Sequence, residues 1–156
     1  TSGEARGQHH AERDRLAVGV VLDAALAHPG LVALLIAPVT RADGLLDWVV
    51  ADPDGDITEG LFGMPEPVGE VLSPLAVNDV DLLIVPAAAV DGTGMRLGWG
   101  RGYFDKTLGS MEHCPPVYAV VFDSELVDEV PRDLHDQPVT GVVTPTRTVV
   151  LAPHRR

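Results

Sequence analysis

Short apolar segments bounded by turn-forming residues are the feature that most limits how this chain can fold. Residues 31–39 form a continuous apolar run, and residues 80–85 are the clearest candidate for a buried strand. Runs of this kind are typical of strands covered on both faces in a parallel sheet. Further strands are expected at residues 45–50, 117–122, 139–143 and 148–151, with helices at residues 12–28 and near residues 102–108. Strands that alternate with helices predict an α/β fold with a mainly parallel sheet.

The domain organisation is expected to be simple. The 156 residues fit one domain, and we predict a disordered tail at residues 1–11 followed by a single domain over residues 12–156. Residues 52–74 are rich in Asp, Gly, Pro and Glu, which predicts a long ordered loop over one end of the sheet. Residues 124–128 are expected to form one helical turn.

Charge and composition exclude several classes of protein. The formal net charge is -12 at pH 7, and such a chain repels a phosphate backbone, so no nucleic-acid partner is expected. Lys106 is the single lysine, which leaves arginine as the main cationic side chain. No apolar run reaches the roughly 18 residues of a membrane span, and Cys114 has no second cysteine with which to form a disulfide. We therefore expect a cytoplasmic protein without a membrane partner.

Five glycines lie between the strand expected at residues 80–85 and the helix expected near residue 102. Glycine lets backbone N–H groups converge on an anion, and the positive N-terminal end of a helix adds to the attraction. Arg96 and Arg101 place two cations beside these glycines, and Asp105 supplies a hard oxygen ligand of the kind that Mg²⁺ prefers. Residues 96–105 are therefore predicted to be a phosphate-binding loop that enters a helix. The glycines are Gly92, Gly94, Gly98, Gly100 and Gly102.

An ordinary strand-to-helix connection with glycines at turn positions is the alternative for this segment. The spacing does not match a Walker A loop, because no Gly-Lys-Ser/Thr follows. Nor does it match the dinucleotide-binding Gly-x-Gly-x-x-Gly, because residue 103 is Tyr. The coincidence of a strand, two arginines, an acid and the aromatic pair Tyr103 and Phe104 favours the phosphate loop. Asp91, just before the glycines, is expected to form a turn rather than to act as an acid.

Together with its flanks, the glycine segment resembles the 5-formyltetrahydrofolate cyclo-ligase family, also called methenyltetrahydrofolate synthetase. The family pattern is Val-Pro, a short segment ending in Asp, and then Arg-Leu-Gly-x-Gly-x-Gly-Tyr-Tyr-Asp. This chain has Val85-Pro86, Val90-Asp91 and residues 96–105 in that order. Supporting matches are residues 125–131, His135-Asp136, residues 142–146, and residues 60–67, which are similar to the Phe-Gly-x-x-Glu-Pro loop of the family.

The resemblance implies a three-layer α/β sandwich with a mainly parallel sheet, of the NagB/RpiA/CoA-transferase type. It also implies an ATP- and Mg²⁺-dependent ligase that acts as a monomer on a reduced folate. In this family the formyl oxygen of 5-formyltetrahydrofolate takes the γ-phosphoryl group of ATP, and the N10 nitrogen then attacks the activated carbon. The products are 5,10-methenyltetrahydrofolate, ADP and phosphate.

The resemblance implies roles for individual residues as well. Asp105 and Asp136 would hold Mg²⁺, and Arg96 and Tyr103 are the implied catalytic residues. Tyr103 would lie against the pterin or the reacting formyl group, with Phe62 as a further candidate for the folate wall. The ATP phosphates would be held by the loop residues Arg96, Leu97, Gly98, Trp99, Gly100, Arg101, Gly102, Tyr103 and Phe104.

Three features near the loop keep two interpretations each. His135 either belongs to a metal or acid/base pair with Asp136 or caps a turn. Trp99 either covers the nucleotide or is a surface aromatic. Residues 144–147 are expected to form a strand-ending turn, with a hydroxyl lining of the phosphate pocket as the alternative.

A departure from the family pattern supports a second functional hypothesis. The N-terminal helix of the family with Lys and Arg for ATP, and its Pro-x-x-x-Glu segment for folate, have no counterpart before residue 31. The alternative is therefore a catalytically impaired paralogue that binds a nucleotide or another anion. A sugar-phosphate isomerase-like enzyme is disfavoured, because no acid/base pair accompanies the loop.

Overall fold

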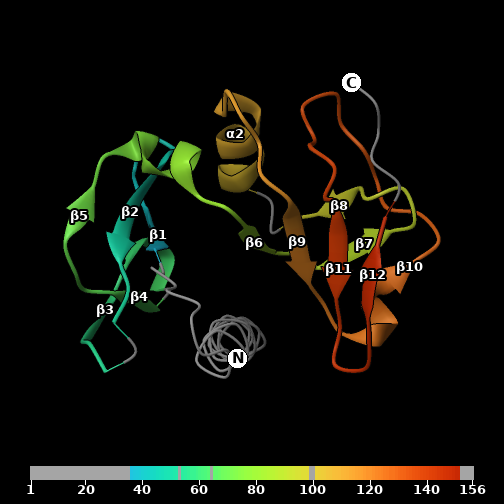
Figure 1. Ribbon diagram of the computed structural model, residues 1–156, viewed down its shortest axis with the longest axis horizontal. Helices are drawn as coiled ribbons and strands as arrows, with labels where there is room; N and C mark the ends of the chain where they lie inside the picture. The colour runs from blue at the N-terminus through green and yellow to red at the C-terminus, as the bar shows by residue number, and fades with distance from the viewer. Residues whose placement is uncertain (1–35, 53, 64, 99–100, 152–156) are drawn as a thin grey trace. The chain divides into compact units, whose positions relative to one another are not determined.

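The computed structural model describes residues 36–52, 54–63, 65–98 and 101–151 (Figure 1). The expected tail at residues 1–11 and helix at residues 12–28 lie outside these residues. The chain divides into two compact units, Thr1–Pro74 and Leu75–Arg156. The single domain expected over residues 12–156 stays a prediction. No helix within the described ranges combines the length and the apolar character that crossing a membrane requires.

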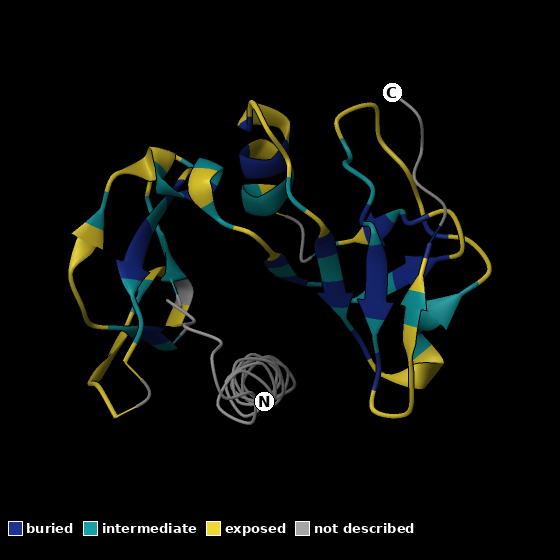
Figure 2. Ribbon diagram, in the orientation of Figure 1, coloured by how far each residue is buried: buried dark blue, intermediate teal, exposed yellow. Residues whose placement is uncertain are grey.

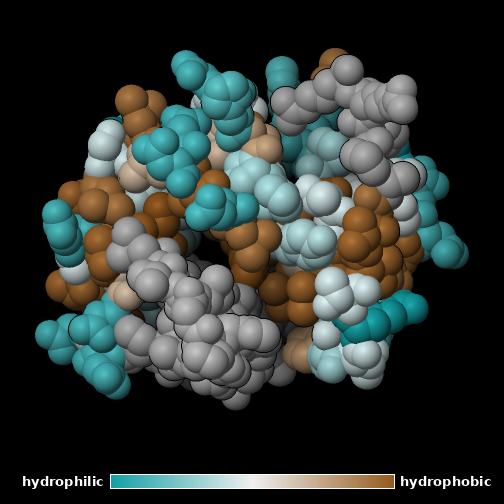
Figure 3. All heavy atoms as spheres, in the orientation of Figure 1, coloured by the Kyte–Doolittle hydropathy of each residue, from teal (hydrophilic) through white to brown (hydrophobic). Residues whose placement is uncertain are grey.

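An antiparallel sheet of strand order β1-β2-β5 forms the first unit. β1 (Ile36–Thr40) and β2 (Leu46–Val50) make a hairpin, and β5 (Val71–Leu72) pairs with the other edge of β2. β2 is the buried strand, because its Leu46, Trp48 and Val49 are at most 4% exposed. Apolar side chains also gather on the surface around β5 (Figure 3), where Val71 is 65% exposed. The strand expected at residues 45–50 is thus confirmed as β2.

The prediction of a long loop at residues 52–74 is wrong. β3 (Ile57–Glu59) and β4 (Pro65–Pro67) pair antiparallel around the 3-10 turn η1 (Leu61–Gly63), and β5 follows. Glu66 of β4 is buried, and its Oε1 accepts hydrogen bonds from the N–H and the hydroxyl of Thr40 at 2.9 and 2.6 Å. Proline and glycine are uncommon in strands, so the sequence did not indicate this pairing. The pairing of β3 with β4 depends on the partner strand and on the hydrogen bond to Thr40 of β1, not on local preference.

A four-stranded sheet of order β12-β11-β9-β6 forms the centre of the second unit. β6 (Leu83–Pro86), β9 (Val117–Val120) and β11 (Gly141–Val143) run parallel, and β12 (Thr148–Val150) is antiparallel to β11. Buried positions concentrate on β9 and β11 (Figure 2), and Ala119 and Val142 are 0% exposed. Burial of the central strands explains why the sequence shows apolar runs here instead of alternation.

A second, smaller sheet in this unit has the order β10-β7-β8. β7 (Ala89–Asp91) pairs antiparallel with β8 (Arg96–Leu97) and parallel with β10 (Leu126–Val127). The helical turn expected at residues 124–128 is found as η3 (Asp123–Glu125), and β10 replaces its second half. A further 3-10 helix, η2 (Pro74–Asp79), precedes β6.

The α/β class is confirmed, but the sheets are mixed. A mainly parallel arrangement holds for the four-stranded sheet, whereas the sheets of the first unit are antiparallel. The prediction of one mainly parallel sheet therefore applies to part of the chain. β1 and β2 are joined by the short connection at residues 41–45, whereas parallel strands need a crossover of about a dozen residues or more. The three-layer arrangement implied by the resemblance stays a prediction.

The helix expected near residues 102–108 is confirmed as α2 (Tyr103–Ser110), the α-helix of the part of the chain that the structure describes. Gly102 precedes it in a left-handed conformation with φ 68°, and the N–H of Lys106 donates to the carbonyl oxygen of Gly102 at 3.0 Å. Thr107 and Leu108 are the buried residues of the helix. The backbone becomes extended at Met111, so the helix ends shortly before Pro115-Pro116.

A buried carboxylate organises the connection after β7. Asp91 is 0% exposed, and its Oδ1 accepts hydrogen bonds from the N–H and the hydroxyl of Thr93 at 2.9 and 2.6 Å and from the N–H of Met95 at 3.2 Å. Its Oδ2 accepts the N–H of Val130 at 3.2 Å. Burial opposes ionisation, but the hydrogen bonds outweigh it and hold the pKa of Asp91 below its ordinary value of 3.8. Asp91 forms a turn, as predicted, and also ties that turn to a distant segment.

Gly94→Ala should destabilise the second unit, whereas Gly92→Ala should be tolerated. Gly94 has φ 88°, and a Cβ at this position would lie 2.6 Å from the carbonyl oxygen of Val139. A Cβ at Gly92 would meet nothing within 4 Å. We expect Gly94→Ala to lower the free energy of unfolding by about 1–3 kcal/mol, measured by urea denaturation. Equal midpoints for the two variants would contradict this interpretation of the turn.

The stability of the folded chain should depend on pH through the ionisation of Asp91. A carboxyl whose pKa is lower in the folded chain stabilises that state fully above the unfolded value of 3.8, and the effect disappears as the pH falls through the folded value. Asp91→Asn should lower the free energy of unfolding by about 1–3 kcal/mol at neutral pH. The gap to the wild type should narrow below pH 3.8. Urea unfolding at neutral and acid pH, with the exposed Asp128→Asn as control, measures this; a gap that is independent of pH would refute it.

Candidate functional site

The predicted phosphate loop begins in a strand and ends at a helix. Arg96 and Leu97 form β8 and pair with Val90 and Ala89 of β7. Trp99 and Gly100 lie outside the described residues. The chain then enters α2 through Gly102, where an added Cβ would meet nothing within 4 Å. Among the described residues, nothing therefore blocks the approach of a ligand at Gly102.

Arg96 is buried beneath this loop, with 5% of its surface exposed. Its Nη1 donates to the carbonyl oxygen of Pro86 at 3.0 Å, and its Nη2 lies 3.1 Å from Oδ1 of Asp105. The guanidinium carbon is 5.9 Å from the ring centroid of Phe104, which is cation–π range. Gly98 leaves room for the guanidinium, since a Cβ there would lie 3.3 Å from Nη1. Arg96 thus ties the end of β6 to the first turn of α2.

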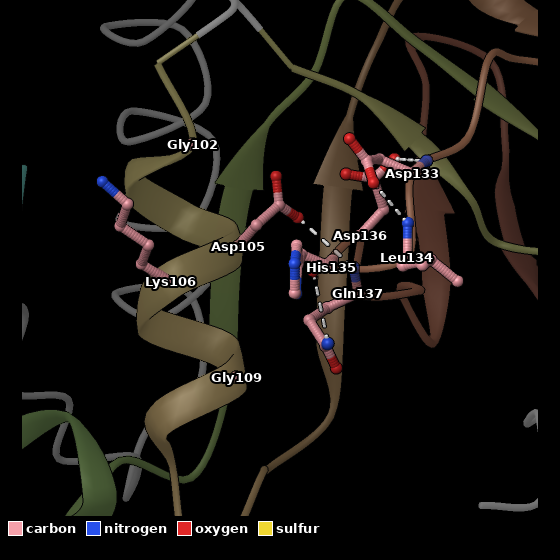
Figure 4. A pocket seen from close by; sticks show the side chains of 9 residues that line it. All are labelled: Gly102, Asp105, Lys106, Gly109, Asp133, Leu134, His135, Asp136 and Gln137. Atoms are coloured by element: carbon pink, nitrogen blue, oxygen red, sulfur yellow. Dashed lines mark hydrogen bonds between the residues drawn. The ribbon is translucent and has the colours of Figure 1, made fainter.

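One face of α2 and the loop that follows residue 132 enclose an open cleft of about 470 Å³ (Figure 4). Small-molecule sites in proteins usually measure roughly 300–1,000 Å³. Asp105 points from the helix toward the loop, whereas Lys106 points away from it (Figure 4). The lining residues are Gly102, Asp105, Lys106 and Gly109 from the helix side and Asp133, Leu134, His135, Asp136 and Gln137 from the loop.

Asp105 and Asp136 each use one carboxylate oxygen in contacts within the protein. Oδ1 of Asp105 accepts the N–H of Gln137 at 3.3 Å in addition to its ion pair with Arg96. Oδ2 of Asp136 accepts the N–H of Asp133 at 2.7 Å. Among the described residues, the other oxygen of each carboxylate has no hydrogen-bond partner. Each side chain therefore keeps one oxygen for a ligand.

A cation in this cleft would depend on these two carboxylates. The described residues contain no group of three or more His, Cys, Asp or Glu side chains arranged to hold a metal. Mg²⁺ commonly binds through one or two carboxylates and completes its shell with water and phosphate oxygens. The arrangement suits a cation that arrives with a phosphorylated ligand better than a permanently caged metal.

The structure brings some of the predicted site residues together. Asp105 and Asp136 line the same cleft, and Gly102 lies at its edge; their ligand roles stay predictions. Arg101 is exposed, while Tyr103 and Phe104 in the first turn of α2 are half-buried. Trp99, Gly100 and the side chain of Phe62 lie outside what the structure describes, so the two interpretations of Trp99 stay open.

Several features of the cleft were not found from the sequence. The inward orientation of Arg96 was not expected, and Asp133 and Lys106 were overlooked although they are close in sequence to Asp136 and Asp105. Gln137 contacts Asp105 through its backbone N–H, a group that nearly every residue carries. No sequence signal therefore exists for that contact.

Residues 144–147 form the strand-ending turn that was expected. The N–H of Thr144 donates to the carbonyl oxygen of Arg147 at 2.8 Å. The hydroxyls of Thr144 and Thr146 both donate to Oδ1 of Asp123 at 2.6 Å. These two hydrogen bonds hold the pKa of Asp123 below its ordinary value. Both hydroxyl hydrogens are engaged within the protein, which favours the turn over the alternative of a phosphate lining.

Comparison with known sequences places the chain among folate enzymes. A model of the 5-formyltetrahydrofolate cyclo-ligase family matches residues 18–145. A 5-formyltetrahydrofolate cyclo-ligase of Mycolicibacterium smegmatis is 37% identical over 139 residues, which cover 80% of this chain and 71% of that protein. The Escherichia coli 5-formyltetrahydrofolate cyclo-ligase is 35% identical over 98 residues, 61% of this chain and 53% of that protein. The match thus spans about half the length of the second relative.

Comparison with solved structures agrees. The chain is similar to the 5,10-methenyltetrahydrofolate synthetase of Aquifex aeolicus, with a TM-score of 0.61 and 31% identity over 79% of this chain and 61% of that one. This similarity supports the α/β fold with mixed sheets. The family match also includes the glycine segment and the cleft residues Asp105 and Asp136. The chain therefore belongs to the 5-formyltetrahydrofolate cyclo-ligase family, a family of enzymes of folate metabolism.

Proposed function

We propose that this chain carries out the ATP- and Mg²⁺-dependent ring closure of 5-formyltetrahydrofolate to 5,10-methenyltetrahydrofolate, with release of ADP and phosphate. The observation that carries this proposal is the pair of Asp105 and Asp136 in one cleft beside the start of α2. Each has one oxygen held by the protein and, among the described residues, the other without a partner. Two carboxylates that each have one oxygen available suit Mg²⁺ whose other ligands are phosphate oxygens of ATP.

The surroundings of the cleft fit a triphosphate. The open approach at Gly102 exposes the N-terminal end of α2, which favours negative charge. The buried guanidinium of Arg96 adds a fixed positive charge, and its Nε has no hydrogen-bond partner among the described residues. The bound Mg²⁺ would supply neutralisation of phosphate charge.

The work of the protein in this reaction is positioning and charge stabilisation, since phosphoryl transfer needs no protein nucleophile. The contacts of Arg96 support a role in holding the loop and Asp105 in place from inside the protein. Tyr103, half-buried at the start of α2, is proposed to contact the reduced folate, with Phe62 as a second candidate contact. A monomeric state is part of the same proposal.

Removing either cleft carboxylate should weaken the use of Mg·ATP. We expect Asp105→Asn and Asp136→Asn to raise the Mg²⁺ concentration for half-maximal ATP binding about 10- to 100-fold, measured by calorimetry at fixed ATP. Asp128→Asn, an exposed carboxylate outside the cleft, is the matched control. An unchanged Mg²⁺ requirement in a folded Asp105→Asn variant would remove Asp105 from the site.

The reaction itself is tested by the absorbance of 5,10-methenyltetrahydrofolate after mixing the protein with 5-formyltetrahydrofolate, ATP and Mg²⁺. We expect product only when all three are present, because the phosphoryl group activates the formyl oxygen as a leaving group. Stabilisation of the fold by Mg·ATP without product would contradict the cyclo-ligase and identify a nucleotide-binding paralogue.

A further inference from the structure

The segment at residues 130–139, here called the strap, is fastened at both ends to the β7–β8 hairpin. The N–H of Val130 donates to the buried Oδ2 of Asp91 at 3.2 Å. The N–H of Val139 donates to the carbonyl oxygen of Gly94 at 2.8 Å. Between these ends the strap supplies one wall of the cleft, including Asp136. The hairpin that holds the first glycines of the segment, Gly92 and Gly94, therefore also fixes both ends of the strap.

Arg132 makes a third connection, inside the strap. Its Nη2 donates to the hydroxyl of Thr93 at 2.9 Å and lies 3.4 Å from Oδ2 of Asp91. The Arg132 side chain is 44% exposed, whereas that of Asp91 is fully buried. The Arg132 side chain thus links the strap to the buried carboxylate of Asp91. Arg132 lies between the family-matching segments at residues 125–131 and 135–136, and no role was expected for it.

The backbone directly after Arg132 orients the carboxylate of Asp136. The N–H of Asp133 donates to Oδ2 of Asp136 at 2.7 Å, and the N–H of Asp136 donates back to the carbonyl oxygen of Asp133 at 3.2 Å. One residue farther on, the N–H of Gln137 reaches Oδ1 of Asp105 at 3.3 Å. The carboxylates of Asp105 and Asp136 are therefore aligned by backbone N–H groups of the same short loop.

The middle of this loop, residues 133–135, is exposed to solvent. Leu134 is 96% exposed, and Asp133 and His135 are exposed as well. A loop without apolar packing takes its geometry from its hydrogen bonds, and a functional carboxylate needs such outer support to keep its orientation.

We propose that Arg132, anchored by Asp91 and Thr93, is a positioning residue that sets the distance and orientation of Asp136 relative to Asp105 for a divalent cation in the cleft. The proposal rests on the function proposed above, because it deepens the assignment of the two carboxylates. Arg132 itself does not line the cleft; it acts through the backbone of Asp133.

Binding of Mn²⁺ alone, without nucleotide or folate, tests this proposal. Paramagnetic broadening of the amide signals of residues 105 and 133–137 reports the cation. We expect Arg132→Ala to raise the Mn²⁺ concentration for half-maximal broadening about tenfold, and Arg132→Lys to recover part of the loss. Arg41→Ala is the matched control, because Arg41 is 36% exposed and also bonds two polar groups, Asp43 and Asp47. It should respond like the wild type.

Amide hydrogen exchange separates positioning from a general loss of structure. We expect Arg132→Ala to accelerate exchange of the Asp136 and Gln137 amides about tenfold, as the loss of a charge-assisted hydrogen bond would, with little change in β9 and β11. If Arg132→Ala does not fold, Thr93→Val, which removes the hydroxyl that accepts from Arg132, should produce the same shift in the Mn²⁺ response.

An unchanged Mn²⁺ response in folded Arg132→Ala would overturn the proposal, as would a wild type that shows no broadening at the strap. Failure of the proposed function is seen separately, as absence of methenyl product with ATP and 5-formyltetrahydrofolate. A lower melting temperature with wild-type Mn²⁺ binding would make Arg132 merely structural.

Discussion

The buried carboxylate of Asp91 is the interaction on which the second unit of this chain depends. An ionised group withdrawn from water is stable only where several donors face it, and Asp91 receives them from Thr93, Met95 and Val130. Two of these donor residues belong to the tight turn after β7, and the third lies 39 positions along the chain. One charged group therefore closes a hairpin and attaches to it the segment that forms a wall of the cleft.

A second buried charge supports the opposite wall. Arg96 reaches the carbonyl of Pro86 at the end of β6 and the carboxylate of Asp105 in α2. In a chain with a formal net charge of -12, this arginine offsets the local negative charge of a cleft that carries three carboxylates. The two buried charges, Asp91 and Arg96, thus support different walls of the cleft. Arg96 contacts Asp105 directly, and Asp91 accepts a hydrogen bond from Val130 at the start of the strap that carries Asp136. The candidate site is thus held by a polar framework attached to an aliphatic core.

Much of the local structure could be predicted, because it depends on neighbouring residues. Apolar runs predicted β2, β6, β9, β11 and β12, although the ends differ by up to three residues. The helix expected near residues 102–108, after the glycines, is α2. The hairpin of β3 and β4 was missed, because its pairing and the bond from Thr40 to Glu66 join residues far apart in sequence. The orientation of Arg96 was missed for the same reason, since an arginine beside glycines can face a ligand or the interior with equal local preference.

The α/β class, the glycine segment, the helix near residue 102 and the family could all be predicted before the fold was known, because they depend on residue types and their spacing along the chain. Three features became visible in the folded chain: Asp105 and Asp136 share one cleft, Arg96 is buried, and Arg132 connects to Asp91. The contacts that align the two carboxylates come from the backbone N–H groups of Asp133 and Gln137. Those groups are common to nearly all residue types, so their positions are specified by the folded chain and not by the residue types that carry them.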